Sequence, residues 1–142
     1  MAVIDASVYV ALFNTQEAGH AASRAWLQGA LSAGESLSAP VILLAEVAAA
    51  LSRGVGDTAL AHEVVRDLAD SGLIQLVPIT LALAARAAAI AADHRVRGCD
   101  AIYLAVAKQL DDQLITLDQQ QLQRGAAIVP TARPHIDNVT GS

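Results

Sequence analysis

Short apolar runs alternate with longer amphipathic segments along the chain, and this alternation predicts the fold class. Buried strands are expected at residues 2–5, 36–39, 74–78, 113–116 and, as a fifth short strand, 127–129. Helical periodicity is expected at residues 7–13, 17–31, 41–53, 57–72, 80–94, 100–110 and 119–124. Apolar strands that alternate with helices are typical of a parallel sheet covered on both faces. We therefore predict an α/β fold, a three-layer α/β/α sandwich around a central parallel sheet of four to five short strands.

Local signals predict where several elements end. Pro40 suits the first turn of the helix expected at 41–53, because its missing N–H has no partner there. The Gly54–Gly56 turn should end that helix, and Asp57 or Thr58 should cap the next one. Residues 130–142 contain two prolines and few apolar side chains, so we expect a folded domain at 1–129 and a flexible C-terminal tail at 130–142.

Composition narrows the class of protein. With 54 % hydrophobic and 16 % charged residues, the chain is not an intrinsically disordered one. Its richest apolar run, 82–92, is interrupted by Arg86 and is too short to span a membrane. Residues 1–13 contain Asp5 and lack the basic start of a signal peptide, so we expect a cytoplasmic protein without a membrane contact. Cys99, the single cysteine, excludes an internal disulfide and should be a small buried side chain.

The charge balance argues against a general nucleic-acid binder. The formal net charge is −5, whereas phosphate contacts require Lys and Arg. Eight of the nine basic residues are Arg, which pairs well with phosphate oxygens and leaves a local phosphate site open. Arg95, Arg97 and Arg124 could contact the phosphates of a ligand at the edge of the predicted sheet, or they could simply be solvated surface residues. Trp26 could lie in the core or in a groove for a partner.

Four carboxylates border apolar runs at similar places in the predicted topology. Asp5 follows the first strand, Asp118 follows the fourth, Glu46 lies in the helix after the second, and Asp100 starts the helix before the fourth. Ligands of parallel sheets bind beyond the carboxyl ends of the strands. No Lys or Arg recurs at a regular spacing from these acids, so a shared cation should neutralise them. Mg²⁺ or Mn²⁺ prefers such oxygen ligands and supports phosphodiester hydrolysis.

Each acid also has a simpler interpretation. Asp5 could be a turn residue at a strand end, and Glu46 lies at the margin of an apolar stripe, from which it could reach solvent. Asp100 and Asp118 stand at helix starts, where Asp is a favoured N-cap. Capping and metal binding can coexist, because one carboxylate oxygen can accept an N–H while the other faces an ion. The four histidines show no metal-ligand spacing.

The four acidic segments together resemble the motifs of a known family. They are Val3-Ile4-Asp5-Ala6-Ser7, Leu44-Ala45-Glu46-Val47, Gly98-Cys99-Asp100-Ala101-Ile102-Tyr103-Leu104-Ala105 and Leu114-Ile115-Thr116-Leu117-Asp118. In order and separation they are similar to the four motifs of PIN domains, above all those of VapC-type toxin ribonucleases. The resemblance implies a Mg²⁺- or Mn²⁺-dependent endoribonuclease, a homodimer, and a cognate antitoxin whose tail covers the active groove.

The same resemblance implies roles for individual residues. Asp5, Glu46, Asp100 and Asp118 would be the catalytic acids, and the three aspartates would also hold the metal ion. Glu46 would orient or deprotonate the attacking water. Ser7 and Thr116 would be supporting residues that order water or the Asp side chains, or they could simply form turns. Arg97, near the same edge, is a further candidate for a supporting residue. An antitoxin Arg could pair with these carboxylates. Gln119–Gln121 stand where another acid or an aromatic is frequent, which argues against a full second metal site.

Two other functions compete with the nuclease. An aspartyl-phosphate phosphotransfer enzyme would need a Lys near the first strand, and the only lysine, Lys108, falls in the middle of a helix. A catalytically idle interaction module that keeps the PIN-like fold is the other alternative. Such a module need not bind Mn²⁺ or be stabilised by it.

Overall fold

A computed structural model describes residues 1–135 of the chain as five strands and eight helical segments. The strands are β1 (Ala2–Ile4), β2 (Leu37–Pro40), β3 (Gln75–Val77), β4 (Gln113–Ile115) and β5 (Thr131–Ala132). The helical segments are α1 (Ala6–Ala11), α2 (His20–Ser32), α3 (Leu43–Ala49), the π-helix η1 (Ala50–Val55), α4 (Thr58–Ser71), α5 (Leu81–His94), α6 (Gly98–Leu110) and α7 (Gln119–Gly125). In this part of the chain, no helix combines the length and apolar character that crossing a membrane requires.

The five strands form one parallel sheet in the order β3-β2-β1-β4-β5. From β1 the chain first builds outward through β2 and β3, and it then returns to add β4 and β5 on the other side of β1. The direction of winding therefore reverses between the central strands β1 and β4. In sheets of this kind, the carboxyl ends of the two strands at such a reversal form the crevice in which ligands bind.

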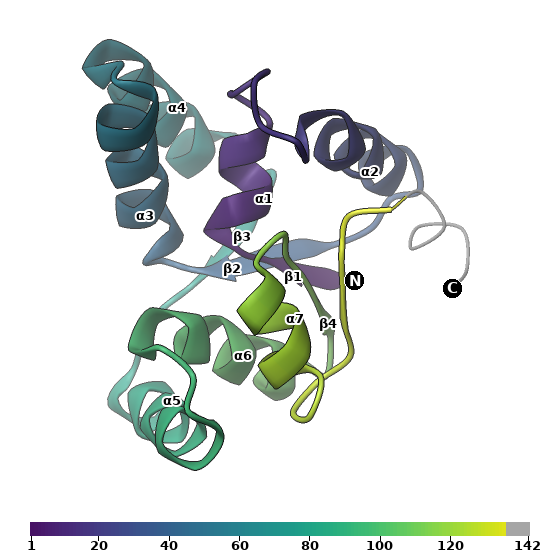
Figure 1. Ribbon diagram of the computed structural model, residues 1–142, viewed down its shortest axis with the longest axis vertical. Coiled ribbons are helices and arrows are strands. Elements are labelled where there is room, and N and C mark those ends of the chain that lie inside the picture. The colour runs from purple at the N-terminus through teal and green to yellow at the C-terminus, as the bar shows by residue number, and fades with distance from the viewer. Residues whose placement is uncertain (136–142) are drawn as a thin grey trace.

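Helices cover both faces of the sheet, as predicted. Figure 1 shows α1 to α4 on one side of the strands and α5, α6 and α7 on the other. Helix α6 packs against β1, β2 and β4 and also against α5. Its buried side chains include three alanines, which let the helix approach the sheet closely. The structure therefore confirms the predicted three-layer α/β/α sandwich with its parallel sheet.

The segment after β2 differs from the sequence prediction. Pro40 is the last residue of β2, paired with Val77, and the helix begins only at Leu43. A proline at the end of a strand interrupts little of the ladder, because the sheet does not continue beyond it. The predicted single helix at 41–53 is also wrong in its second half, since η1 continues α3 with a wider turn and ends at Gly56 in the left-handed conformation.

The last strand lies later in the chain than predicted. Residues 127–129 are a turn after α7, in which Ile128 and Val129 donate to the carbonyl of Gly125. The strand follows at Thr131–Ala132, where the Leu114 N–H donates to Pro130 (2.8 Å) and the Thr116 N–H to Ala132 (3.0 Å). The segment predicted as a tail therefore begins with a strand of the sheet. The rest of that tail, residues 136–142, lies outside the described residues.

Two single side chains settle open questions from the sequence. Trp26 is 1 % exposed and belongs to the hydrophobic core, so the alternative that it lies in a groove for a partner was wrong. Cys99, which was expected to be buried, is exposed in the first turn of α6. The buried positions of this helix begin two residues later, at Ala101, so a small apolar side chain at position 99 does not reach the core.

Candidate active site

The ends of β1 and β4 bring the first and last predicted acids together. Asp5 directly follows β1, and its N–H donates to the carbonyl of Ile115, the last residue of β4 (3.2 Å). Asp118 follows two residues after Thr116 at the start of α7. Because both strands are parallel and adjacent, their following turns lie at the same edge of the sheet. The two acids therefore lie beside the switch point of the sheet.

Asp5 is a buried carboxylate with a full set of donors. Asp5 is 4 % exposed, and its side chain caps α1 by accepting a hydrogen bond from the N–H of Ser7 (3.1 Å). The hydroxyls of Ser7 and Thr116 donate to its two oxygens. Burial raises the pKa of Asp5 to about 6, the hydrogen bonds from Ser7 and Thr116 oppose this rise, and the Asp100 carboxylate adds to it.

Ser7 and Thr116 connect Asp5 with the turn that carries Asp118. The Ser7 hydroxyl accepts from the N–H of Leu117 (2.9 Å), and the Thr116 hydroxyl accepts from the N–H of Asp118 (3.0 Å). Each hydroxyl thus donates to Asp5 while it receives a backbone N–H from the β4–α7 turn. The two hydroxyls therefore order the Asp5 side chain and also hold the turn between β4 and α7, so two of the interpretations open to them apply together.

Arg97 joins Asp100 to Asp118. Its Nε donates to Asp100 Oδ2 (2.9 Å) and its Nη2 to Asp118 Oδ2 (2.8 Å). Asp118 also caps α7 by accepting from the N–H of Gln121 (3.1 Å). Asp100, by contrast, is the third residue of α6 and does not cap it, because the N-cap position belongs to Arg97. Burial raises the pKa of Asp100, and the guanidinium of Arg97 acts against that rise.

This contact corrects an expectation from the sequence. No Lys or Arg recurs at a regular spacing from the acids, so we expected a shared cation to neutralise them, yet Arg97 neutralises two of them. One signal for the contact was present, since residues three apart in a helical first turn are neighbours. The contact between Arg97 and Asp118 joins residues 21 positions apart, which only the assembled sheet brings together. Of the other two arginines predicted at this edge, Arg124 donates to the backbone carbonyl of Arg95, and both remain exposed side chains.

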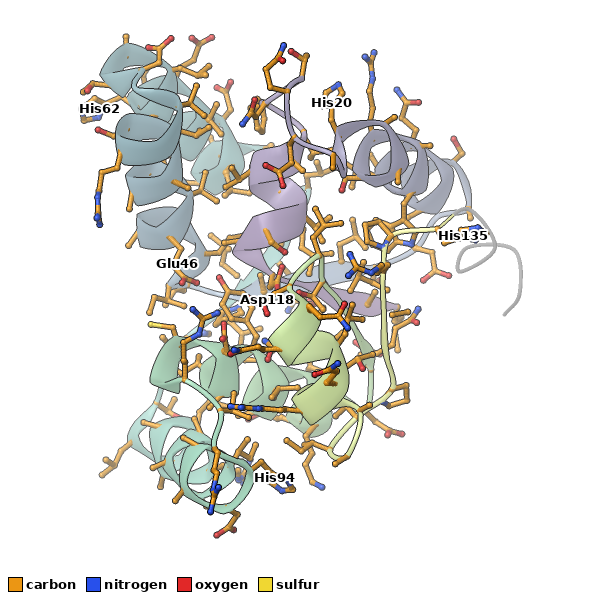
Figure 2. The ribbon with its side chains drawn as sticks, viewed as in Figure 1. His20, Glu46, His62, His94, Asp118 and His135 are labelled. Carbon is orange, nitrogen blue, oxygen red and sulfur yellow. The ribbon has the colours of Figure 1, made fainter. Side chains whose placement is uncertain are left out.

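Glu46 faces the site from the opposite layer. It lies in the first turn of α3, is half-buried, and accepts a hydrogen bond from the hydroxyl of Tyr103 (2.6 Å). Burial and the Glu46 carboxylate both raise the pKa of Tyr103, so this phenol stays a donor. Figure 2 shows Glu46 and Asp118 near the centre of the view, whereas the four labelled histidines lie toward its periphery. The sequence analysis gave Tyr103 no role in the site and missed this contact, although Tyr103 lies one turn after Asp100.

Comparison with known proteins places this geometry in a family. The sequence profile of the PIN domain family matches residues 2–127. The chain belongs to the PIN domain family.

Solved structures share the fold of this PIN domain at low sequence identity. VapC20 of Mycobacterium tuberculosis, a toxin that cleaves the sarcin–ricin loop, is 21 % identical with a TM-score of 0.75, over 94 % of this chain and 100 % of VapC20. A toxin–antitoxin complex from Klebsiella pneumoniae is 20 % identical with a TM-score of 0.63, over 95 % and 98 % of the two chains. FitAcB from Neisseria gonorrhoeae is 22 % identical with a TM-score of 0.65, over 94 % and 98 %. No curated protein matches the chain in sequence.

The oxygen donors of this PIN domain suit a hard divalent cation. Asp5, Asp100, Asp118 and Glu46 supply carboxylates, which are the ligands that Mg²⁺ and Mn²⁺ prefer. Within residues 1–135, however, no three His, Cys, Asp or Glu side chains are arranged to hold one ion together. Two of the predicted ligands instead share the guanidinium of Arg97. The carboxylate oxygens are therefore chemically suited to a divalent cation. In the structure, however, Asp100 and Asp118 are arranged around the guanidinium of Arg97.

Gln121 is a further residue of this site that the sequence analysis did not single out. Its side chain is 1 % exposed, and its Nε2 donates to the backbone carbonyl of Asp100 (3.3 Å). Its backbone N–H is the group capped by Asp118. Gln121 therefore links the start of α6 to the start of α7. The only sequence signal was a run of three glutamines in which helical periodicity turns the third one inward.

Proposed function

We propose that this PIN domain is a metal-dependent endoribonuclease that hydrolyses RNA phosphodiester bonds. One observation carries the proposal: the buried Asp5 lies with Asp100 and Asp118 beside the carboxyl ends of the central strands. Arg97 balances Asp100 and Asp118, and a divalent ion would also balance the buried Asp5, whose oxygens accept from uncharged hydroxyl and N–H donors. Family membership and the shared fold with VapC20 support the same chemistry.

The residues have separate roles in this proposal. Asp5, Asp100 and Asp118 hold Mg²⁺ or Mn²⁺, which when bound supplies positive charge to the scissile phosphate and favours deprotonation of water. Ser7 and Thr116 keep both oxygens of Asp5 in a single orientation. Glu46 accepts the proton of the attacking water, and the Tyr103 hydroxyl holds one of its oxygens in place. Arg95 and Arg124 are candidates for contacts with RNA phosphates.

Substitution of the acids tests this proposal. The purified chain should cleave RNA when Mg²⁺ or Mn²⁺ is present and stop when EDTA is added. Asp5→Asn and Asp100→Asn should each lower the cleavage rate by at least about 100-fold. Removing a residue that only positions a metal ligand typically costs up to about 100-fold, so the loss of a ligand itself should cost at least that much. Asp70→Asn, which changes an exposed carboxylate on α4, is the matched control and should cleave normally. Wild-type cleavage rates in Asp5→Asn would remove Asp5 from the mechanism.

We further propose that the nuclease is the toxin of a toxin–antitoxin pair and forms a homodimer. The toxin VapC20 and the toxin–antitoxin complex from Klebsiella pneumoniae, which share its fold, support the toxin assignment. An antitoxin encoded beside the gene should co-purify with the chain and suppress cleavage, and the mass of the free chain in solution should be that of two copies. A neighbouring gene product that binds without suppressing cleavage would contradict the inhibitory role.

The idle interaction module remains the second candidate, because Arg97 already balances two of the four acids. Such a module would bind its partner without cleaving RNA in any divalent cation. The phosphotransfer alternative has less support. Lys108 lies in the last turn of α6, beside Arg86 and Gln109 in a groove between α5 and α6, and not at the carboxyl end of β1.

A further inference from the structure

The guanidinium of Arg97 lies between the two least buried of the three aspartates. The Arg97 side chain is 66 % exposed, while those of Asp100 and Asp118 are 19 % and 30 % exposed. Arg97 caps α6 without a side-chain hydrogen bond to the helix, so the guanidinium is used entirely on the two carboxylates. The hydrogen bond and negative charge of Asp100, together with the charge of Asp118, raise the pKa of Arg97 above its ordinary value, which keeps the guanidinium charged.

Both oxygens of Asp118 are occupied in this arrangement. Oδ2 accepts from Arg97 and Oδ1 accepts from the N–H of Gln121 at the start of α7. Each oxygen keeps a further lone pair, but an ion that approaches Oδ2 meets the charged guanidinium of Arg97, and an ion that approaches Oδ1 competes with the helix cap. An ion pair to an exposed side chain stabilises a fold less than a helix cap does. The exposed Arg97 is the partner that leaves more easily.

The two acids are also held at a spacing that suits one guanidinium. Gln121 ties the start of α7 to the backbone of Asp100 through its buried side chain. The Nε and Nη2 atoms of Arg97 then contact one carboxylate each. A divalent ion placed between the same carboxylates would be repelled by the guanidinium at close range. Arg97 and a divalent ion therefore exclude each other.

We propose that Arg97 is an internal competitor for the divalent ion, which it replaces as the cation between Asp100 and Asp118. This inference rests on the proposed function, in which these acids bind a divalent ion. When Mn²⁺ binds, the guanidinium leaves both carboxylates and turns into solvent, where its side chain already is for the most part. The affinity for the ion is then lower than the carboxylates alone would provide.

Direct measurement of Mn²⁺ binding without RNA tests the competition. Titration calorimetry, or the loss of the free-Mn²⁺ signal in electron paramagnetic resonance, gives the dissociation constant of each variant. Arg97→Gln should bind Mn²⁺ more tightly than the wild type, on the order of tenfold, which lies in the usual range for coupled binding events. Arg95→Gln removes the same charge two residues earlier in the chain. Among the residues that the structure describes, Arg95 forms no side-chain ion pair, so this variant should stay within about twofold of the wild type.

Each other outcome has a distinct meaning. Equal Mn²⁺ affinity in Arg97→Gln and Arg95→Gln, or weaker binding in Arg97→Gln, would overturn the competition. RNA cleavage that depends on Mn²⁺ would then still stand, and with it the proposed function. If neither the wild type nor Arg97→Gln binds Mn²⁺ and neither cleaves RNA, both the proposed function and the competition are wrong. Circular dichroism of each variant shows whether the fold is kept.

Discussion

Asp5 shows how one buried carboxylate can be held without a charged partner. Its residue is 4 % exposed, and the groups on its two oxygens are the hydroxyls of Ser7 and Thr116 and one backbone N–H. These donors stabilise the ionised form, but burial destabilises it more strongly, so the pKa rises to about 6. Asp5 is therefore a costly residue for the fold in the absence of a cation.

This cost predicts a specific dependence of stability on pH. Asp5 has a pKa of about 6 in the folded protein against an ordinary value of 3.8. Between these values the folded state binds more protons than the unfolded state, so the free energy of unfolding falls as the pH rises from about 4 to above 6. The fall attributable to Asp5 should be at most roughly 3 kcal/mol.

Urea unfolding in EDTA at several pH values measures this effect. Asp5→Asn should lose the part of the pH dependence that belongs to Asp5, whereas Asp70→Asn on the exposed face of α4 should retain it. Parallel stability curves for the wild type and Asp5→Asn would mean that Asp5 titrates near its ordinary pKa.

At the level of single residues, the sequence indicates positions better than contacts. The acids at the ends of β1 and β4 could be placed because apolar strands followed by Asp are visible in one dimension. The bridge from Arg97 to Asp118 and the bond from Tyr103 to Glu46 join residues 21 and 57 positions apart. Such pairs depend on how helices dock on the sheet, which no local pattern specifies.

At the level of elements, the helix after β2 shows where periodicity misleads. An apolar stripe continues from α3 into η1, so the pattern predicts one helix, but the backbone changes to a wider π-helical turn at Ala50. This change carries Arg53 and Gly54 to the rim of an open hollow of about 570 Å³ that Glu46 also lines. π-Helical turns are frequent at functional sites. Side-chain periodicity carries no information about which carbonyl accepts each N–H.

The end of η1 provides a matched pair of glycine substitutions. Gly56 has a φ of +81°, a conformation that costs an L-residue about 1–2 kcal/mol, so Gly56→Ala should lower the free energy of unfolding by about that amount. Gly54 lies inside η1 without a positive φ, and an added Cβ meets no atom within 4 Å. Gly54→Ala should therefore be neutral or stabilising by up to ~1 kcal/mol. Urea unfolding of both variants checks this, and equal losses would contradict the left-handed turn.

At the level of the whole molecule, the topology determines that the site exists only in the folded chain. The contact between Asp5 and Thr116 joins residues 111 positions apart, and Glu46 reaches the same region from the opposite helical layer. The α/β class and the two covered faces followed from the alternation of short apolar runs and helices. The strand order did not, because the return from β3 to the far side of β1 leaves no signature in hydrophobic periodicity.

Because the proposed metal ligands come from distant segments of the chain, ion binding should stabilise the entire domain. An ion that binds only the folded state raises the free energy of unfolding, by about 2.7 kcal/mol when its concentration is 100 times the dissociation constant. The single tryptophan, Trp26, is buried in the core and reports global unfolding by its fluorescence. The midpoint of urea unfolding should therefore rise with Mn²⁺ in the wild type and in Asp70→Asn. Asp100→Asn should show little or no rise, because it removes one of the carboxylates proposed to bind the ion. A wild-type midpoint that Mn²⁺ leaves unchanged at millimolar concentration would favour the idle module over the nuclease, since an enzyme that depends on this ion must bind it in the folded state.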